Sequence, residues 1–147
     1  MEYFQTAPGF ETSHVLSGFD WSLLPEKSTV VDVGGSHGVA CFEIARQHPS
    51  LQFIVQDREE IIKAAKVPDN LQSQIKFVAY DFFQEQPVKG ADVYFYRWIF
   101  HNWSDKYCQK ICRALIPALK PGARLLIQEI LLPEPGELSA LQEREAR

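Results

Sequence analysis

The fold of this chain is decided by the stretch Val30-Val31-Asp32-Val33-Gly34-Gly35-Ser36-His37-Gly38. It begins as an apolar strand at about 29–33, passes into a glycine-rich turn and continues into a helix expected over 37–47. A second strand, at about 52–56, ends in Asp57. Strand, glycine turn, helix, strand and acid, in that order, are typical of open α/β sheets that bind a nucleoside-containing cofactor.

Strands and helices are predicted to alternate along the rest of the chain. Further strands are expected at about 75–80, 91–96 and 124–129, and helices near 13–24 and over 58–66. Another helix, capped by Ser104, has an apolar stripe of Cys108, Ile111, Cys112, Leu115 and Leu119. The predicted fold is therefore α/β, with a mostly parallel Rossmann-like sheet and helices on both faces.

The polar residues that follow the strands are expected to lie on one rim. Right-handed crossovers bring the carboxyl ends of parallel strands to the same edge of the sheet, where ligands bind in such folds. Asp57, Asp81, the segment after Tyr96 and Glu129 all follow predicted strand ends.

Composition indicates one globular domain. The 147 residues are 46% hydrophobic with a net charge of -4, which argues against nucleic acid as a partner. No apolar run reaches the roughly 18–20 residues of a membrane span, and no signal peptide is evident at the amino terminus. The three cysteines suggest a reducing, cytoplasmic setting, and the four histidines lack metal-ligand spacing, so no metal site is expected.

The glycine turn is a candidate cofactor cradle. Glycines allow a tight turn and a close approach of the backbone to a ligand, although a plain turn without a ligand is an alternative. Asp57 could accept hydrogen bonds from a ribose diol, and Asp81 from an exocyclic amine while Phe82 packs against the base. The glycines concerned are Gly34, Gly35 and Gly38.

Asp32, inside the first strand, narrows the choice of cofactor. Dinucleotide-binding strands usually run apolar into their glycines, whereas an acid here fits an amino-acid-bearing cofactor with a cationic end, which favours S-adenosylmethionine. Asp32 could meet an ammonium group through water, or anchor the backbone of the loop, or do both.

A second signal is the segment Arg97-Trp98-Ile99-Phe100-His101-Asn102-Trp103-Ser104-Asp105. A histidine just past a strand end, among aromatic residues, could act as a general base at neutral pH. A lone histidine is more often a structural hydrogen-bonding group. Glu129, at the end of the neighbouring fifth strand, favours the catalytic interpretation because a carboxylate can orient an imidazole.

Together these motifs resemble the caffeate-type small-molecule O-methyltransferases, especially the fungal branch that acts on polyketides and aromatic secondary metabolites. The resemblance rests on Val31–Gly35, on His101-x-Trp103-Ser104-Asp105, and on Pro121–Arg124 followed by Glu129. It implies a class I methyltransferase sheet that binds S-adenosylmethionine through the glycine loop, Asp57, Asp81 with Phe82, and Arg97. It also implies that His101 deprotonates the acceptor hydroxyl, that Glu129 flanks it, and that no metal is needed.

The sequence departs from the family pattern in three ways. Ser36 replaces a frequent glycine, and Asn102 stands where aspartate is common. Family members also carry a preceding helical dimerisation region and further final strands. We therefore expect a helical lead-in over 1–28, a cofactor domain over 29–132 and a polar tail over 133–147, with the fifth strand left as an apolar edge that recruits a second copy or a partner chain.

Three functions are compatible with the sequence. The first is an O-methyltransferase, or a fragment of one, that acts on a hydroxylated aromatic or polyketide-type metabolite. The second is a non-methylating relative that binds the cofactor and acts with a partner chain or guides another reaction. The third is a nucleotide-binding oxidoreductase, which Asp32 and the His101 segment disfavour.

Overall fold

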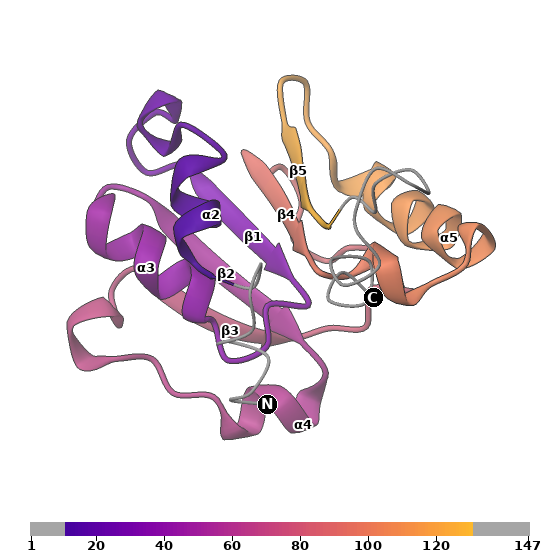
Figure 1. Ribbon diagram of the computed structural model, residues 1–147, viewed down its shortest axis with the longest axis horizontal. Helices are drawn as coiled ribbons and strands as arrows, with labels where there is room; N and C mark the ends of the chain where they lie inside the picture. The colour runs from indigo at the N-terminus through magenta and orange to yellow at the C-terminus, as the bar shows by residue number, and fades with distance from the viewer. Residues whose placement is uncertain (1–10, 131–147) are drawn as a thin grey trace, which may run out of the picture.

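Figure 1 shows the fold as a computed structural model, which describes residues 11–130 of the 147. The chain enters through α2 (Ser13–Ser17) and a short 3-10 helix, η1 (Trp21–Leu23). One helix was expected near 13–24, but it is divided because α2 ends at Gly18 and the Asp20 side chain caps η1 by accepting a hydrogen bond from Ser22 N. Residues 1–10 of the expected lead-in, 131–132 of the expected cofactor domain and the whole expected tail lie outside the described residues.

The centre of the fold is a parallel sheet of five strands in the order β3-β2-β1-β4-β5. Each strand lies within two residues of its predicted position, and apolar β-branched and aromatic residues dominate the three central strands. The mostly parallel sheet is thus confirmed. The strands are β1 (Thr29–Val33), β2 (Gln52–Asp57), β3 (Ile75–Ala79), β4 (Val93–Arg97) and β5 (Arg124–Gln128).

Helices cover both faces of the sheet, as Figure 1 shows. On one face α2 and α3 (Val39–Gln47) pack over a core that includes Trp21, Phe53 and Phe95. On the other face α5 (Asp105–Leu115) packs over a core that includes Tyr94 and Tyr96. The smaller elements are α4 (Glu59–Ala64), η2 (Asp69–Leu71), η3 (Phe100–Asn102) and η4 (Ile116–Ala118).

The predicted apolar stripe of α5 is only partly right. Ile111 and Leu115, one turn apart, are buried, whereas Cys108 is half-buried and Cys112 is exposed. Leu119 is 43% exposed because the helix ends at Leu115 and the chain continues through η4. α5 therefore contacts the core along one narrow line rather than a broad face.

The switch point of the sheet lies between β1 and β4. The chain leaves β1 towards β2 and leaves β4 towards β5, so the loops that follow β1 and β4 diverge. Such divergence opens a crevice at the carboxyl ends of the strands. Within residues 11–130, no helix is both long and apolar enough to cross a membrane.

Candidate functional site

The glycine loop after β1 is held by the end of β2. The backbone N–H groups of Gly34 and Gly35 both donate to the carbonyl oxygen of Gln56, at 2.7 and 3.0 Å. The next N–H, from Ser36, donates to Oδ2 of Asp57 at 2.9 Å. Three consecutive amides of the loop are therefore satisfied by two adjacent residues of β2.

Left-handed backbone conformations explain the composition of the loop. Gly34 and Gly38 have φ values of 75° and 78°, and Ser36 has a φ of 52°. The frequent glycine of the family at the Ser36 position would adopt this conformation without the steric cost that a side chain brings. A Cβ on Gly34 would lie 2.5 Å from Cδ1 of Ile99, so this position also requires close approach.

Asp32 lies against Gly35. A Cβ on Gly35 would come within 2.4 Å of Oδ2 of Asp32, which explains a glycine at a position where φ is not positive. The Cys41 thiol donates to Oδ2 at 3.3 Å, while Oδ1 is buried without a hydrogen-bond partner. Burial raises the pKa of Asp32 to about 6, although the Cys41 hydrogen bond and the nearby charge of Arg97 oppose this rise. The loop amides are anchored by β2 rather than by Asp32.

A cavity of about 560 Å³ opens at the carboxyl edge of the strands beside this loop. Four of the predicted cofactor-binding residues line it together, namely Gly34, Asp57, Asp81 and Phe82. The other residues on its wall are Arg58, Tyr80, Phe83, Ile99, Asn102 and Trp103.

The remaining predicted cofactor residues lie off the cavity wall. Gly35, Gly38, Asp32 and Arg97 do not line the cavity. Gly38 caps α3 and packs beside Phe77 and Phe42, which leaves little space for a side chain. Arg97, at the end of β4, is half-buried; burial lowers the pKa of its guanidinium, and the charge of Asp32 opposes that effect.

The two acids of the cavity carry different local hydrogen bonds. Asp57 accepts from Ser36 N through Oδ2 and from Arg58 N through Oδ1. Asp81 accepts from Phe83 N through Oδ1 at 3.0 Å. Because each carboxylate oxygen can accept more than one hydrogen bond, both side chains retain capacity for ligand hydroxyl or amine groups.

An aromatic cluster forms the apolar part of the cavity. The ring centroids of Phe83 and Trp103 are 4.7 Å apart, and those of Phe82 and Trp103 are 6.0 Å apart, both edge to face. Tyr107 extends the cluster outward, with its centroid 5.9 Å from that of Phe83. Such rings present a broad apolar surface to a planar ligand.

His101 and Glu129 meet at the same rim. His101 lies in η3, and its Nδ1 is 3.7 Å from Oε2 of Glu129, which follows β5. The other carboxylate oxygen, Oε1, accepts from the backbone N–H groups of Ile99 and Phe100 at 2.9 and 2.7 Å. The chain turns into this segment at Trp98, where φ is 59°. Glu129 therefore fixes the backbone that carries His101 as well as facing its ring.

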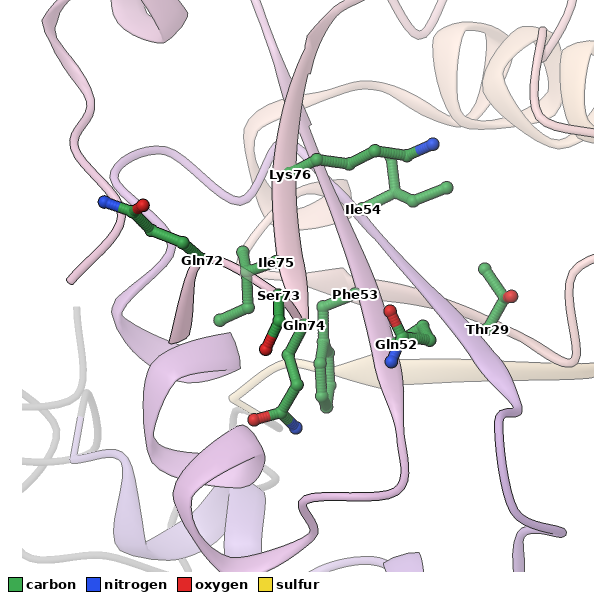
Figure 2. Close-up of a pocket in the computed structure, with 9 residues that line it drawn as sticks. All are labelled: Thr29, Gln52, Phe53, Ile54, Gln72, Ser73, Gln74, Ile75 and Lys76. Carbon is green, nitrogen blue, oxygen red and sulfur yellow. The ribbon is translucent and has the colours of Figure 1, made fainter. Parts of the chain in front are cut away.

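A second hollow, of about 340 Å³, lies at the opposite end of the strands (Figure 2). Its wall comes from the starts of β1, β2 and β3, and includes Gln74 and Lys76. The Gln74 amide already donates to the carbonyls of Ala45, His48 and Leu51. This hollow contains none of the predicted functional residues. Within residues 11–130, no group of three or more His, Cys, Asp or Glu side chains could hold a metal ion.

Comparison with known proteins identifies the family of this chain. The profile of the O-methyltransferase domain family matches residues 1–144. The chain belongs to this O-methyltransferase family. The grayanic acid biosynthesis cluster O-methyltransferase of Cladonia grayi is 46% identical over 151 residues, a match that covers 100% of this chain and 33% of that protein. The chain thus spans about a third of the length of such relatives.

Solved structures agree with the fold. Human N-acetylserotonin methyltransferase in complex with S-adenosylmethionine is 30% identical, with a TM-score of 0.75, over 90% of this chain and 37% of the human chain. A pericyclic reaction enzyme is 33% identical, with a TM-score of 0.68, over 80% of this chain and 31% of its own. The class I methyltransferase fold is confirmed, and S-adenosylmethionine is the cofactor that the family and these neighbours indicate.

Some residues in and around the cavity were not anticipated from the sequence. Cys41 was not linked to Asp32, and Gln56 was not connected to the glycine loop. Ile99 and Arg58 were not predicted to line the cavity. One sequence feature could have pointed to the role of Gln56, because it is a polar residue inside an apolar strand, directly before the candidate acid Asp57.

Proposed function

We propose that this chain forms the cofactor-binding and catalytic part of an O-methyltransferase that methylates a hydroxyl of an aromatic or polyketide-type secondary metabolite. The observation that supports this proposal is one rim that combines the cavity of Gly34, Asp57, Asp81 and Phe82 with the adjacent pair of His101 and Glu129. Family membership and the fungal relatives support the same activity.

The cavity suits the parts of S-adenosylmethionine. Asp57 would accept from the ribose hydroxyls, and Asp81 from the exocyclic amine of adenine, while the rings of Phe82 and Trp103 would contact its apolar surface. Asp32 is buried off the cavity wall, so its unpartnered Oδ1 would act on a cationic amino-acid end through water. When bound, the cofactor would supply an activated methyl group on a sulfonium.

The protein's part in the reaction is deprotonation and alignment. Nδ1 of His101 faces Glu129, so Nε2 is the nitrogen that accepts the proton from the acceptor hydroxyl. The deprotonated acceptor oxygen would then take the methyl group that the bound sulfonium supplies, and the demethylated thioether would leave as the second product. Glu129 orients the imidazole and stabilises its protonated form.

Transfer of labelled methyl groups tests the proposal. The full chain is incubated with methyl-labelled S-adenosylmethionine and a panel of hydroxylated aromatic acceptors, and the products are separated by chromatography. We expect label in a methyl ether, and none in products of the His101→Ala variant. Equal labelling by wild type and His101→Ala would refute the general-base role.

A non-methylating function is the second candidate. The similarity to a pericyclic reaction enzyme, at 33% identity, supports it. In this case the chain would bind S-adenosylmethionine and produce no labelled methyl ether from any acceptor. A known methyltransferase, run in the same assay as a positive control, would produce the labelled ether.

The remaining expectations concern partners and setting. Leu125 and Ile127 on β5 are 42% and 52% exposed, and their exposure supports pairing of this edge with a strand of a second copy. Sedimentation would test this: a monomer at high concentration whose β5 amides resist hydrogen exchange would contradict it. A small-molecule acceptor and a cytoplasmic setting are part of the same proposal, and the free thiols of Cys41, Cys108 and Cys112 support the latter.

A further inference from the structure

Gln56 and Gln86 form a buried pair of amides outside the cavity. Both side chains are 0% exposed. Nε2 of Gln56 donates to Oε1 of Gln86 at 2.8 Å, and Nε2 of Gln86 donates to Oε1 of Gln56 at 2.9 Å. Oε1 of Gln86 also accepts from the backbone N–H of Val88. The Nε2 group of each side chain and Oε1 of Gln56 thus have the partner glutamine as their hydrogen-bond partner.

The neighbours of Gln56 in the sheet are apolar. In the register of the sheet Gln56 lies between Val33 of β1 and Val78 of β3, and both neighbours are apolar. An apolar side chain would continue the pattern of the strand. Burying two amides in such a layer costs free energy unless they are hydrogen-bonded, and their mutual hydrogen bonds offset that cost in one relative geometry only.

The geometry that the pair fixes is the end of β2. The carbonyl of Gln56 accepts both the Gly34 and the Gly35 amides, and Asp57, the next residue, accepts the Ser36 amide. A change in the position or tilt of residue 56 would therefore move the whole glycine loop and the Asp57 carboxylate. Gly34 of this loop and Asp57 both line the cavity.

Gln86 connects this strand end to the opposite layer of the fold. Its backbone N–H donates to the carbonyl of Ala114 in α5 at 2.9 Å. α5 follows the segment that carries His101. The pair thus joins the two halves of the switch point, the loop after β1 and the helix after β4.

We propose that Gln56 and Gln86 are positioning residues for the cofactor cavity, which hold the glycine loop in register so that their loss weakens cofactor binding more than it weakens the fold. The ligand in this inference rests on the proposed function, whereas the effect on the loop does not.

The test replaces both amides with methionine, which has a similar length and no amide. The Gln56→Met/Gln86→Met chain leaves no buried side-chain amide unpaired, and the part-buried backbone N–H of Val88 is the one group that loses its acceptor. Gln74→Met is the matched control. Gln74 lies in the hollow of Figure 2, away from the cavity, and its amide donates to three backbone carbonyls. Hydrogen exchange of backbone amides, thermal unfolding and titration with S-adenosylhomocysteine are measured on the full chain.

In the double variant we expect the Gly34 and Gly35 amides to exchange about tenfold faster or more, while amides of β1 and β4 change less than about twofold. The dissociation constant for S-adenosylhomocysteine should rise at least about fivefold. Gln74→Met should lower the unfolding temperature but change neither the exchange of the Gly34 and Gly35 amides nor the affinity for S-adenosylhomocysteine.

Two results would overturn the inference. One is a double variant that does not fold, and the other is a folded double variant with unchanged loop exchange and affinity. A wild-type chain that does not bind S-adenosylhomocysteine would instead refute the proposed function, and the exchange of Gly34 and Gly35 would still decide the role of the pair.

Discussion

Glu129 faces His101 with one carboxylate oxygen and holds the backbone before it with the other. Oε2 lies 3.7 Å from Nδ1 of His101, and Oε1 accepts from the N–H groups of Ile99 and Phe100. One side chain thus links the end of β5 to the turn after β4. Different substitutions of Glu129 can separate its role in holding the backbone from its role in facing the imidazole.

Glu129→Ala should destabilise the fold by about 2 kcal/mol, because two backbone N–H groups lose their acceptor. Glu129→Gln keeps an amide oxygen at that place and should cost less than half as much. Urea unfolding followed by circular dichroism measures both. Glu59→Ala, which removes an exposed ion pair with Lys63 and an acid from the first turn of α4, is the control and should cost less than about 1 kcal/mol. Equal losses for the two Glu129 variants would contradict this role.

His101→Ala should leave affinity for S-adenosylhomocysteine within about twofold of wild type, because the imidazole does not line the cavity. Titration calorimetry measures this directly. A large loss of affinity would mean that His101 binds the cofactor rather than the acceptor. Combined with the labelling assay, this result separates a base from a binding residue.

Gly35→Ala should be among the most damaging small substitutions in the chain. The added Cβ would lie 2.4 Å from Oδ2 of Asp32 and 2.8 Å from Cγ1 of Val55, so we expect a loss of about 2–3 kcal/mol. Gly90→Ala is a useful comparison, because Gly90 has a φ of 69° but nothing within 4 Å of the added carbon. It should cost only about 1 kcal/mol. Denaturant unfolding that ranks Gly90→Ala as the worse variant would refute the steric argument.

Asp32 should make stability depend on pH. Its pKa is raised by burial from 3.8 to about 6 in the folded state, so the folded chain binds the proton more tightly than the unfolded chain does. Its contribution to stability is therefore fully present below pH 4 and is lost as pH rises through about 6. Asp57, Cys41 and Arg97 also act on this carboxyl.

The measurement is the difference in unfolding free energy between wild type and Asp32→Asn from pH 4 to 8. On the order of 3 kcal/mol should shift in favour of the variant over this range. The affinity of wild type for S-adenosylhomocysteine should instead rise as pH rises through about 6, because a cationic ligand end favours the ionised Asp32 carboxylate. A difference that does not change with pH would contradict the perturbed pKa.

The sequence allowed the framework to be predicted more fully than the details of the site. Apolar runs, the alternation at 75–80 and the glycine turn allowed all five strands to be predicted, because the strands of a parallel sheet leave strong local patterns. The face of α5 was wrong in part, since Cys112 is apolar enough to belong to a stripe yet lies outside the line that contacts the core. Local periodicity does not specify how much of a helix is covered.

Interactions between distant residues were the least predictable. The rim shared by Asp57 and Asp81 follows from topology, and the cavity contains both. The thiol of Cys41 on Asp32 and the amide pair of Gln56 and Gln86 depend instead on side-chain geometry across elements. Nothing in the spacing of these residues along the chain indicates such contacts.

Calorimetric titration of the full chain with S-adenosylhomocysteine tests the cofactor site most directly, since it requires neither an acceptor nor turnover. We predict saturable binding of one molecule per chain, weakened about tenfold or more by Asp57→Asn and unchanged by Asp69→Asn, the same substitution away from the cavity. Absence of binding by a chain that circular dichroism shows to be folded, or equal binding by the two variants, would contradict the account.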